Sequence, residues 1–160
     1  MIFIKGKHKM LDNTDIKILK ELSKNSRITM KDLGEKVHMT GQAVSLRVAK
    51  LEENNVIEGY GVKVNHSKLG YPIHAMINIT NTKAQNHKPF INFVEEQYKY
   101  VLHNYKVSGE GCYLLECRFP SNEILDEFIT NLNNYVNYRV TIIINDANKN
   151  KQCLEILGSF

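Results

Sequence analysis

Residues 40–55 read TGQAVSLRVAKLEENN, which is typical of a short amphipathic helix between two polar caps. Thr40 is a favoured N-cap residue, because its hydroxyl oxygen can accept a backbone N–H of the first turn. Three apolar residues then fall within a narrow arc at about 100° per residue: Val44, Val48 and Leu51. Asn55 predicts the end of the helix, since Asn is the best non-glycine residue for a left-handed C′ position.

Two shorter helices are predicted before this one, each with its own N-terminal cap. The first begins at Asp12-Asn13-Thr14-Asp15, where a carboxylate stands three residues after the N-cap. The second begins at Thr29, with Asp32 in the corresponding position, and ends near His38. Their apolar residues recur at helical spacing: Ile16, Ile18, Leu19, Leu22, Leu33 and Val37. Three short helices, the last two joined by about three residues, predict a helix-turn-helix.

The pattern changes after the third helix. Residues 56–64 read VIEGYGVKV, a β-rich run that predicts a wing or a connecting strand. Alternating or β-rich residues then predict strands at 73–80, 100–107, 112–119 and 138–144, with amphipathic helices around Phe90–Tyr98 and from Ser121 to Leu132. This βαββαβ order is ferredoxin-like, with two helices on one face of an antiparallel sheet. The predicted fold class is therefore α+β, a winged helix-turn-helix followed by a ferredoxin-like domain.

Composition and charge narrow the class of protein. The chain has 160 residues, 42% apolar and 24% charged, an ordinary globular balance. Its longest β-like run, residues 140–144, is far shorter than the ~18 residues of a membrane helix, and no signal peptide is recognisable, so we expect neither export nor insertion. The net charge of +4 lies wholly in residues 1–65, which suggests a polyanionic partner for that part. The three cysteines, Cys112, Cys117 and Cys153, fit no zinc spacing and are expected to be reduced.

The outward side of the predicted 40–54 helix carries groups suited to DNA. Gln42 can address an adenine edge with two hydrogen bonds, Ser45 can serve any base, and apolar side chains can meet a thymine methyl. Basic side chains on the flanks and the helix N-terminus can hold phosphates. The predicted DNA-contacting residues are Lys31, Thr40, Gly41, Gln42, Ser45, Leu46, Arg47, Ala49 and Lys50. The alternative is an ordinary solvated face on a three-helix scaffold.

A series of motifs runs in order through residues 10–148: Leu11-Asp12, Asp15, Ile18-Leu19, Leu22, Arg27, Leu33-Gly34, Val44, Arg47-Val48, Leu51-Glu52, Val56-Ile57, Tyr60 and Lys68-Leu69-Gly70. The series resembles that of the Lrp/AsnC (leucine-responsive, feast/famine) transcriptional regulators. The resemblance implies a DNA-binding regulator and not an enzyme, without a cofactor, whose helix at 40–54 enters the major groove. It also implies assembly through the C-terminal, RAM-type domain, as a homodimer or an octamer.

The chain departs from the family pattern at three places. His38 and Asn55 replace glycines, and both residue types tolerate a positive φ better than most. The amino-acid-responsive members of the family carry a Gly-x-x-Asp motif, whereas residues 109–112 here read GEGC. The corresponding effector residues are Gly109, Glu110, Gly111 and Cys112. A neutral thiol cannot replace the carboxylate that helps to hold a zwitterion, so a regulator with an amino-acid effector and one without both stay open.

Two enzymatic interpretations rank below the regulator. Cys112 as a nucleophile has no His or acid at a recognisable motif spacing, so a packing role is favoured. A few proteins resembling this family are haem-pathway decarboxylases that act on tetrapyrroles. Such an enzyme needs basic or His residues around a large pocket, for which His74, His103 and Arg118 are the candidates.

The sequence predicts five segments: a basic arm at 1–9, a helix-turn-helix at 10–55, a connector at 56–70, a ferredoxin-like domain at 71–148 and a tail at 149–160. The arm either tracks the DNA backbone or is disordered. We expect a cytoplasmic, nucleoid-associated protein that binds double-stranded DNA and no membrane. Because the outward face of the third helix is mostly uncharged, we expect a weak sequence preference, with bending or wrapping of DNA by an oligomer.

Overall fold

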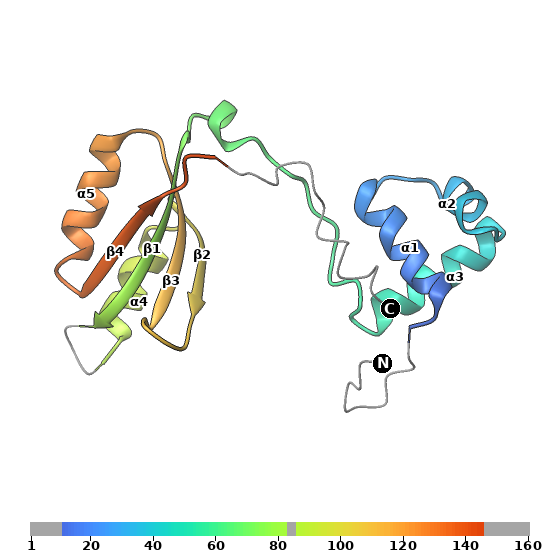
Figure 1. Cartoon of the computed structure of the whole chain (residues 1–160), viewed down its shortest axis with the longest axis horizontal. Coiled ribbons are helices and arrows are strands. Elements are labelled where there is room, and N and C mark those ends of the chain that lie inside the picture. Colours follow the sequence, from blue (N-terminus) through green and yellow to red (C-terminus); the bar gives the residue numbers. More distant parts are fainter. Residues whose placement is uncertain (1–10, 83–85, 146–160) are drawn as a thin grey trace. The chain divides into compact units, whose positions relative to one another are not determined.

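The computed structural model describes residues 11–82 and 86–145 (Figure 1). Three helices come first, and a short 3₁₀ helix (His66–Leu69) precedes a βαββαβ succession. The described residues divide into two compact units between Val62 and Lys63. We call residues 11–62 the helical unit and residues 63–145 the sheet unit. The predicted arm at 1–9 and tail at 149–160 lie outside the described residues.

The helical unit consists of α1 (Asn13–Lys24), α2 (Met30–Val37) and α3 (Gly41–Glu53). These are the three predicted helices, with ends within about one residue of those expected. Seven buried apolar side chains form their common core: Ile18, Leu22, Leu33, Val37, Val44, Val48 and Leu51. The apolar stripes of the sequence therefore meet as the helical period predicts.

Each helix begins with a side-chain cap. At α1 the capping box is complete, since the Asp12 carboxylate accepts the Asp15 backbone N–H at 2.8 Å and the Asp15 carboxylate accepts the Asp12 N–H at 3.1 Å. At α2 only half of the predicted box forms, because the Thr29 hydroxyl accepts the Asp32 N–H at 3.1 Å without the return bond. The Thr40 hydroxyl caps α3 through the backbone N–H of Ala43 at 3.2 Å.

The turn between α2 and α3 depends on two unusual backbone positions. His38 is left-handed, with φ 58° and ψ 46°, as its place in the turn predicts. Gly34 is buried in α2, and the Met39 N–H donates to its carbonyl oxygen at 2.8 Å. A Cβ added at Gly34 would lie 2.6 Å from the Met39 carbonyl oxygen, closer than real Cβ atoms come. Glycine at position 34 is therefore what lets the chain fold back so tightly after α2.

The end of α3 also follows the prediction. Asn55 adopts φ 54°, the left-handed conformation expected after the C-cap. The N–H groups of Val56 and Ile57 then both donate to the Leu51 carbonyl oxygen, at 2.8 and 3.1 Å. These bonds satisfy a carbonyl group that the helix itself leaves free.

The segment at 56–64, predicted as a wing or a connecting strand, does not pair as a strand within the single described chain. No strand is assigned there, and the side chains of Val62 and Val64 are 88% and 46% exposed. A strand needs a neighbouring strand for its backbone hydrogen bonds. None of the four strands in the described residues pairs with this segment, so its β propensity goes unused within one copy.

The sheet unit contains β1 (Ile73–Thr82), β2 (Val101–Lys106), β3 (Tyr113–Phe119) and β4 (Val136–Ile142). They form one sheet of order β2-β3-β1-β4, and all its pairs are antiparallel. With the two intervening helices this is the predicted βαββαβ arrangement, visible in Figure 1. The α+β, ferredoxin-like fold class is thereby confirmed.

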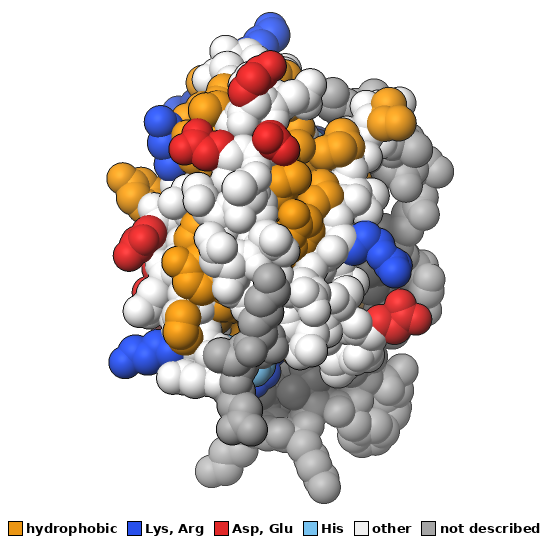
Figure 2. All heavy atoms as spheres, turned by 90° about the vertical axis from the view of Figure 1, so that its left-hand side faces the viewer, with side chains coloured by type: hydrophobic (Ala, Val, Ile, Leu, Met, Phe, Trp, Pro, Cys, Tyr) orange, Lys and Arg blue, Asp and Glu red, His pale blue; other side chains and the backbone are white. Residues whose placement is uncertain are grey.

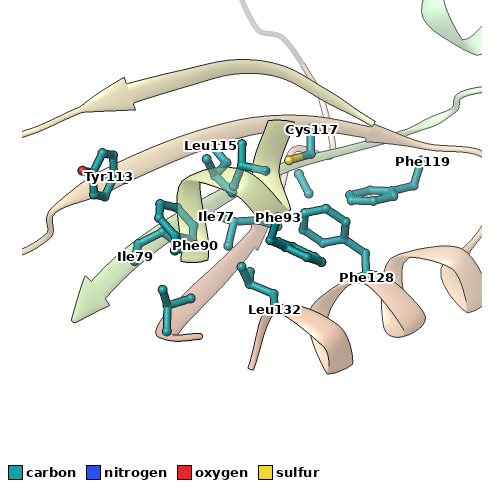
Figure 3. Packing of buried hydrophobic residues seen from close by; sticks show 13 residues of the cluster. Ile77, Ile79, Phe90, Phe93, Tyr113, Leu115, Cys117, Phe119, Phe128 and Leu132 are labelled. Atoms are coloured by element: carbon teal, nitrogen blue, oxygen red, sulfur yellow. The ribbon is translucent and has the colours of Figure 1, made fainter. Parts of the chain in front are cut away.

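Helices α4 (Lys88–Glu96) and α5 (Asn122–Leu132) cover the same face of this sheet. Figure 3 shows aromatic rings from both helices packed on the branched side chains of the central strands. β4 begins at Val136 rather than at 138, because the fully buried Val136 pairs with Thr82 in the ladder. It ends two residues earlier than predicted, and Ile144 beyond it is 97% exposed.

The other face of the sheet has no helix over it within the described residues, and we call it the open face. Strand alternation separates it from the core face, as β3 shows by being buried at every second residue. Cross-strand pairing assigns these residues to the open face: His74, Met76, Asn78, His103, Tyr105, Leu114, Glu116, Arg118, Arg139 and Thr141. Most of the residues on its two central strands are half-buried.

Candidate nucleic-acid interface

The solvent side of α3 carries the side chains predicted to read DNA. Gln42, Ser45 and Ala49 are exposed, and Leu46 is 69% exposed. Three buried residues on the opposite side of α3 pack into the core of the helical unit: Val44, Val48 and Leu51. The core thus holds the helix in one rotation, with a mainly uncharged face turned outward.

The N-terminus of α3 lies beside the first turn of α2. A Cβ added at Gly41 would lie 3.2 Å from both the N and Cα atoms of Lys31, so the two backbones approach closely there. Lys31 is exposed, and its backbone lies beside the start of α3, where anions are favoured. The Thr40 hydroxyl uses an oxygen lone pair for its cap and keeps a proton to donate.

The helical unit carries no net charge to attract DNA. Residues 11–62 contain eight Lys or Arg and eight Asp or Glu. The excess of positive charge predicted for residues 1–65 comes from Lys5, Lys7, Lys9 and Lys63. Because the unit has no net charge, any attraction to a polyanion depends on the positions of individual cations such as Lys31.

Arg47 stands on the flank of this face and is already paired. Its Nη1 lies 2.7 Å from Asp12 Oδ2 and 2.7 Å from Asp15 Oδ1, and its side chain is 33% exposed. Hydrogen bonds to Asp12 and then to Asp15 raise the pKa of Arg47. The structure thus brings Arg47 to the first turn of α1, where its Nη1 is shared by two carboxylates and only its other N–H groups stay available for the predicted DNA contacts. Lys50, at the far end of the face, is exposed.

The sequence pattern of α3 alone could not reveal these two acidic partners. Asp12 and Asp15 precede Arg47 by 35 and 32 residues, and both were predicted only as cap residues of α1. The sequence held one signal of this pairing, because Asp12, Asp15 and Arg47 all belong to the family motif series.

Two carboxyl groups of the helical unit have lowered pKa values. The Asp15 backbone N–H, followed by the hydrogen bond from Arg47, lowers the pKa of Asp12. Hydrogen bonds from Lys24 and then Lys36 lower the pKa of Glu21. A carboxyl group with a lower pKa in the folded state stabilises the fold above its unfolded pKa, which is about 4. This stabilisation is lost as the pH falls through the folded pKa.

We therefore expect α1 to lose stability below about pH 4, and Asp12→Asn to reduce this acid sensitivity. The amide keeps an oxygen to cap the helix, and Glu21 accounts for the acid sensitivity that remains. Amide hydrogen exchange of α1 peptides, compared between variant and wild type at each pH, measures the effect. Equal acid sensitivity in the two proteins would contradict the prediction.

The predicted effector residues lie in the loop between β2 and β3. Gly109 has φ 111°, which other residues rarely adopt, and a Cβ at Gly111 would overlap the Asn78 side chain. The Cys112 N–H donates to the Ile79 carbonyl oxygen at 2.8 Å, and its side chain packs half-buried against the sheet core. Glu110 is exposed. The backbone thus fixes this loop, and the Cys112 side chain packs against the core.

Thiol chemistry finds little support in the described part of the chain. Cys117 is fully buried, and burial, followed by the charge of Glu116, raises its thiol pKa to about 12. Almost no reactive thiolate forms there near neutral pH. Within the described ranges no three His, Cys, Asp or Glu side chains are grouped as metal ligands, and no helix is long and apolar enough to cross a membrane.

The three candidate tetrapyrrole residues come together on the open face of the sheet. His74 lies opposite Arg118 in the β1–β3 ladder, and His103 lies opposite Glu116 on β2–β3. The His74 Nε2 is 2.9 Å from Glu116 Oε1. These side chains therefore lie on a sheet surface.

A hollow of about 200 Å³ lies on the helix side of the sheet, between α4 and α5. Figure 2 shows the side on which α5 lies, where hydrophobic side chains are exposed between charged ones. The hollow is smaller than the roughly 300–1,000 Å³ of typical ligand pockets. None of the three tetrapyrrole candidates lines it.

Known proteins similar to this chain were found by sequence and by structure. A family model described as winged helix-turn-helix DNA-binding matches residues 11–58, and one described as the Lrp/AsnC ligand binding domain matches residues 74–152. The HTH-type transcriptional regulator LrpA of Bacillus subtilis is 57% identical over 84% of this chain and 98% of that protein. LrpB of the same organism is 35% identical over 87% and 92%.

Two solved structures match this chain over most of its length. Bacillus subtilis LrpC matches with a TM-score of 0.80 at 28% identity, covering 88% of this chain and 99% of that one. A feast or famine regulatory protein from M. tuberculosis, solved complexed with L-methionine, matches with a TM-score of 0.77 at 28% identity, covering 91% and 99%. These similar proteins are named as regulators, and none of their names supports the tetrapyrrole decarboxylase alternative.

Proposed function

This chain belongs to the Lrp/AsnC family of DNA-binding transcriptional regulators, and we propose that it reads the major groove with α3 as a homodimer joined through its sheet unit. The observation that carries the proposal is the outer face of α3, the second helix of the helix-turn-helix, which is exposed over a fully packed core. In this docking geometry that helix lies in the groove and its outer side chains meet base edges.

The chemistry of the face defines the proposed contacts. Gln42 and Ser45 offer polar groups to base edges, and Leu46 and Ala49 offer methyl groups to thymine. Contacts to phosphate come from Lys31 and Lys50 at the two ends of the face, and from Thr40 and the N–H of Gly41 at the helix start. A reading face with so few charged groups gives a weak sequence preference. Bending or wrapping of DNA by the oligomer then adds selectivity.

A second copy of the chain is the proposed partner of the open face. The Asn78 Oδ1 and Arg118 Nε atoms are buried there, yet neither has a hydrogen-bond partner in the described structure. Leaving such a group unpaired costs about 1–3 kcal/mol. Both atoms lie beneath the surface of a single copy, so a two-fold related copy would instead cover the half-buried side chains around them and exclude water from this face. Met76 and Leu114 supply apolar area between them.

The connector supports the same assembly. Its β-rich residues 56–64 have no strand beside them within one described copy, and Val62 is almost fully exposed. The same segment of a second copy offers an antiparallel neighbour for its free backbone groups. Whether dimers assemble further, as in an octamer, depends on surfaces beyond this pairing.

We place the protein in the cytoplasm, on nucleoid DNA, because its ligand is the chromosome. The sheet unit matches a ligand-binding family model, and one similar protein was solved with L-methionine. In this chain Cys112 stands where the family carries Asp, and the nearest acid, Glu110, is exposed. An amino acid therefore lacks one charged contact at this loop, so we expect regulation without a strong amino-acid switch.

We expect Ser45→Glu to weaken binding to a duplex about 100-fold, because a carboxylate at the centre of the reading face meets both base-edge acceptors and phosphates. Fluorescence anisotropy with a random-sequence duplex across a salt series measures the effect. The wild type should bind with submicromolar affinity at low salt and lose it steeply as salt rises.

Ser67→Glu is the matched control, because it adds the same charge on the exposed 3₁₀ helix of the sheet unit. It should bind like the wild type. Absence of wild-type binding even at low salt would overturn the proposed DNA-reading function. Equal losses in the two variants would mean that added charge, and not the face of α3, decides the affinity.

A further inference from the structure

Two carboxylates contact the single positive charge of Arg47. Its Nη1 contacts one oxygen of Asp12 and one of Asp15, both at 2.7 Å. The Asp12 side chain is 51% exposed, whereas that of Asp15 is 17% exposed. The cluster of these three residues, which we call the Arg47 clamp, therefore has a formal charge of −1 beside the outer face of α3.

This balance changes what Arg47 offers to DNA. A guanidinium that binds a phosphate donates to it and cancels its charge. In the clamp the same donor nitrogen already faces two carboxylates, and the exposed Asp12 would repel an approaching phosphate. Phosphate binding at Nη1 thus requires displacing a carboxylate, and a phosphate that approaches the remaining donors, Nη2 and Nε, meets the exposed negative charge of Asp12.

The clamp also determines where α3 lies. It joins α3 to the first turn of α1 across 32 and 35 residues of sequence. α1 and α3 also share the apolar core, which contains both Ile18 and Val44. A planar guanidinium that bridges two fixed carboxylates adds an orientation that apolar packing alone does not supply.

We propose that Asp12 and Asp15 hold Arg47 as a positioning residue of the reading helix and keep its charge away from DNA phosphates, which lowers non-specific affinity. This inference rests on the proposed DNA-reading function of α3. Asp12 and Asp15, which lie outside the helix-turn-helix pair, would thereby influence the ratio of specific to non-specific binding. That ratio, and not affinity alone, decides how a regulator finds its sites.

Asp→Asn substitutions separate the charges of the clamp from the helix cap. Asn is as good an N-cap as Asp, and an amide oxygen at position 15 can still accept the Asp12 N–H. The double variant Asp12→Asn/Asp15→Asn therefore removes two negative charges and leaves α1 able to start at the same residue. The exposed acids Glu35 and Glu58 of the same unit offer a matched pair, Glu35→Gln/Glu58→Gln, with the same loss of charge.

The experiment measures the salt slope of binding to a random-sequence duplex, the change of log Kd with log salt concentration. The double Asn variant should bind more tightly than wild type, with a slope steeper by about 0.9, which corresponds to one added phosphate contact. Adding Arg47→Gln to it should return the slope to the wild-type value. Arg47→Gln alone should lower affinity without reducing the slope, and the double Gln control should leave the slope unchanged.

Three results would overturn the inference. A shallower slope in Arg47→Gln alone would mean that Arg47 already binds phosphate in the wild-type complex. If the slope of the double Asn variant stays steep when Arg47→Gln is added, the steepening comes from the general loss of negative charge and not from Arg47. An equally steep slope in the double Gln control would mean the same. If the double Asn variant does not fold, which circular dichroism reports, Arg47→Gln alone still decides. Failure of the wild type to bind DNA would refute the proposed function instead, so the two failures are distinguishable.

Discussion

Gly34→Ala is expected to destabilise the helical unit by about 2–4 kcal/mol and to abolish DNA binding. In an unconstrained helix the same change would stabilise by about 1 kcal/mol, because alanine is the better helix former. Here the new Cβ would lie 2.6 Å from the Met39 carbonyl oxygen and 3.1 Å from the N of Gly41. Both atoms belong to backbone, so relief requires moving the turn and the start of α3, and overpacking outweighs propensity.

Hydrogen exchange of peptides from α1 to α3 in the full chain measures this loss, together with duplex binding by anisotropy. Gly59→Ala is the control, because nothing lies within 4 Å of a Cβ added at Gly59. It should change stability by less than about 0.5 kcal/mol. If Gly34→Ala behaved like Gly59→Ala, the close approach after α2 would not limit the fold.

Leu114→Glu is expected to convert the dimer into a monomer and to weaken binding to a two-half-site duplex at least 100-fold. A loss of this size is expected because linking two binding sites typically raises affinity by about 100-fold or more. Leu114 lies opposite Asn78 on the open face and on the same side of β3 as Glu116. A second carboxylate there would place like charges against each other across a two-fold axis and would have to be buried without a partner. Light scattering on a sizing column measures the assembly.

Asn131→Glu is the matched control, since it adds a carboxylate at an exposed position on α5, on the helix side of the sheet. It should stay dimeric and bind DNA like the wild type. A dimeric Leu114→Glu protein, or a monomeric Asn131→Glu protein, would move the interface away from the open face.

Local patterns were sufficient for most of the fold. The caps at Asp12 and Thr40, the apolar arcs of α1 to α3 and the alternation in β1 each depend on residues close in sequence. His38 and Asn55 adopt the positive φ that their positions predict. The family motifs, read in order, indicated a DNA-binding regulator, which the matches to known proteins confirm.

Local patterns were insufficient where a residue depends on a partner that is remote or absent. The segment at 56–64 has the composition of a strand, but β structure needs a neighbour, and one described copy provides none. For Arg47 the DNA contact stays a prediction, but its spacing on α3 gave no sign of the two carboxylates from α1 that contact its Nη1. The start of β4 shifted to Val136 because its pairing with β1 extends to Thr82.

The sequence by itself thus determined the elements, their order, the buried faces and the family, because these follow from periodicity, caps and motifs within short windows. Tertiary structure alone decided which charges are available to a ligand and which surface lacks a partner. Electrostatic pairing and burial depend on distances in space, and Arg47 and Asp12 come within 2.7 Å although 35 residues separate them. The same holds for Asn78 and Arg118, whose unpaired buried atoms appear only once the sheet is formed.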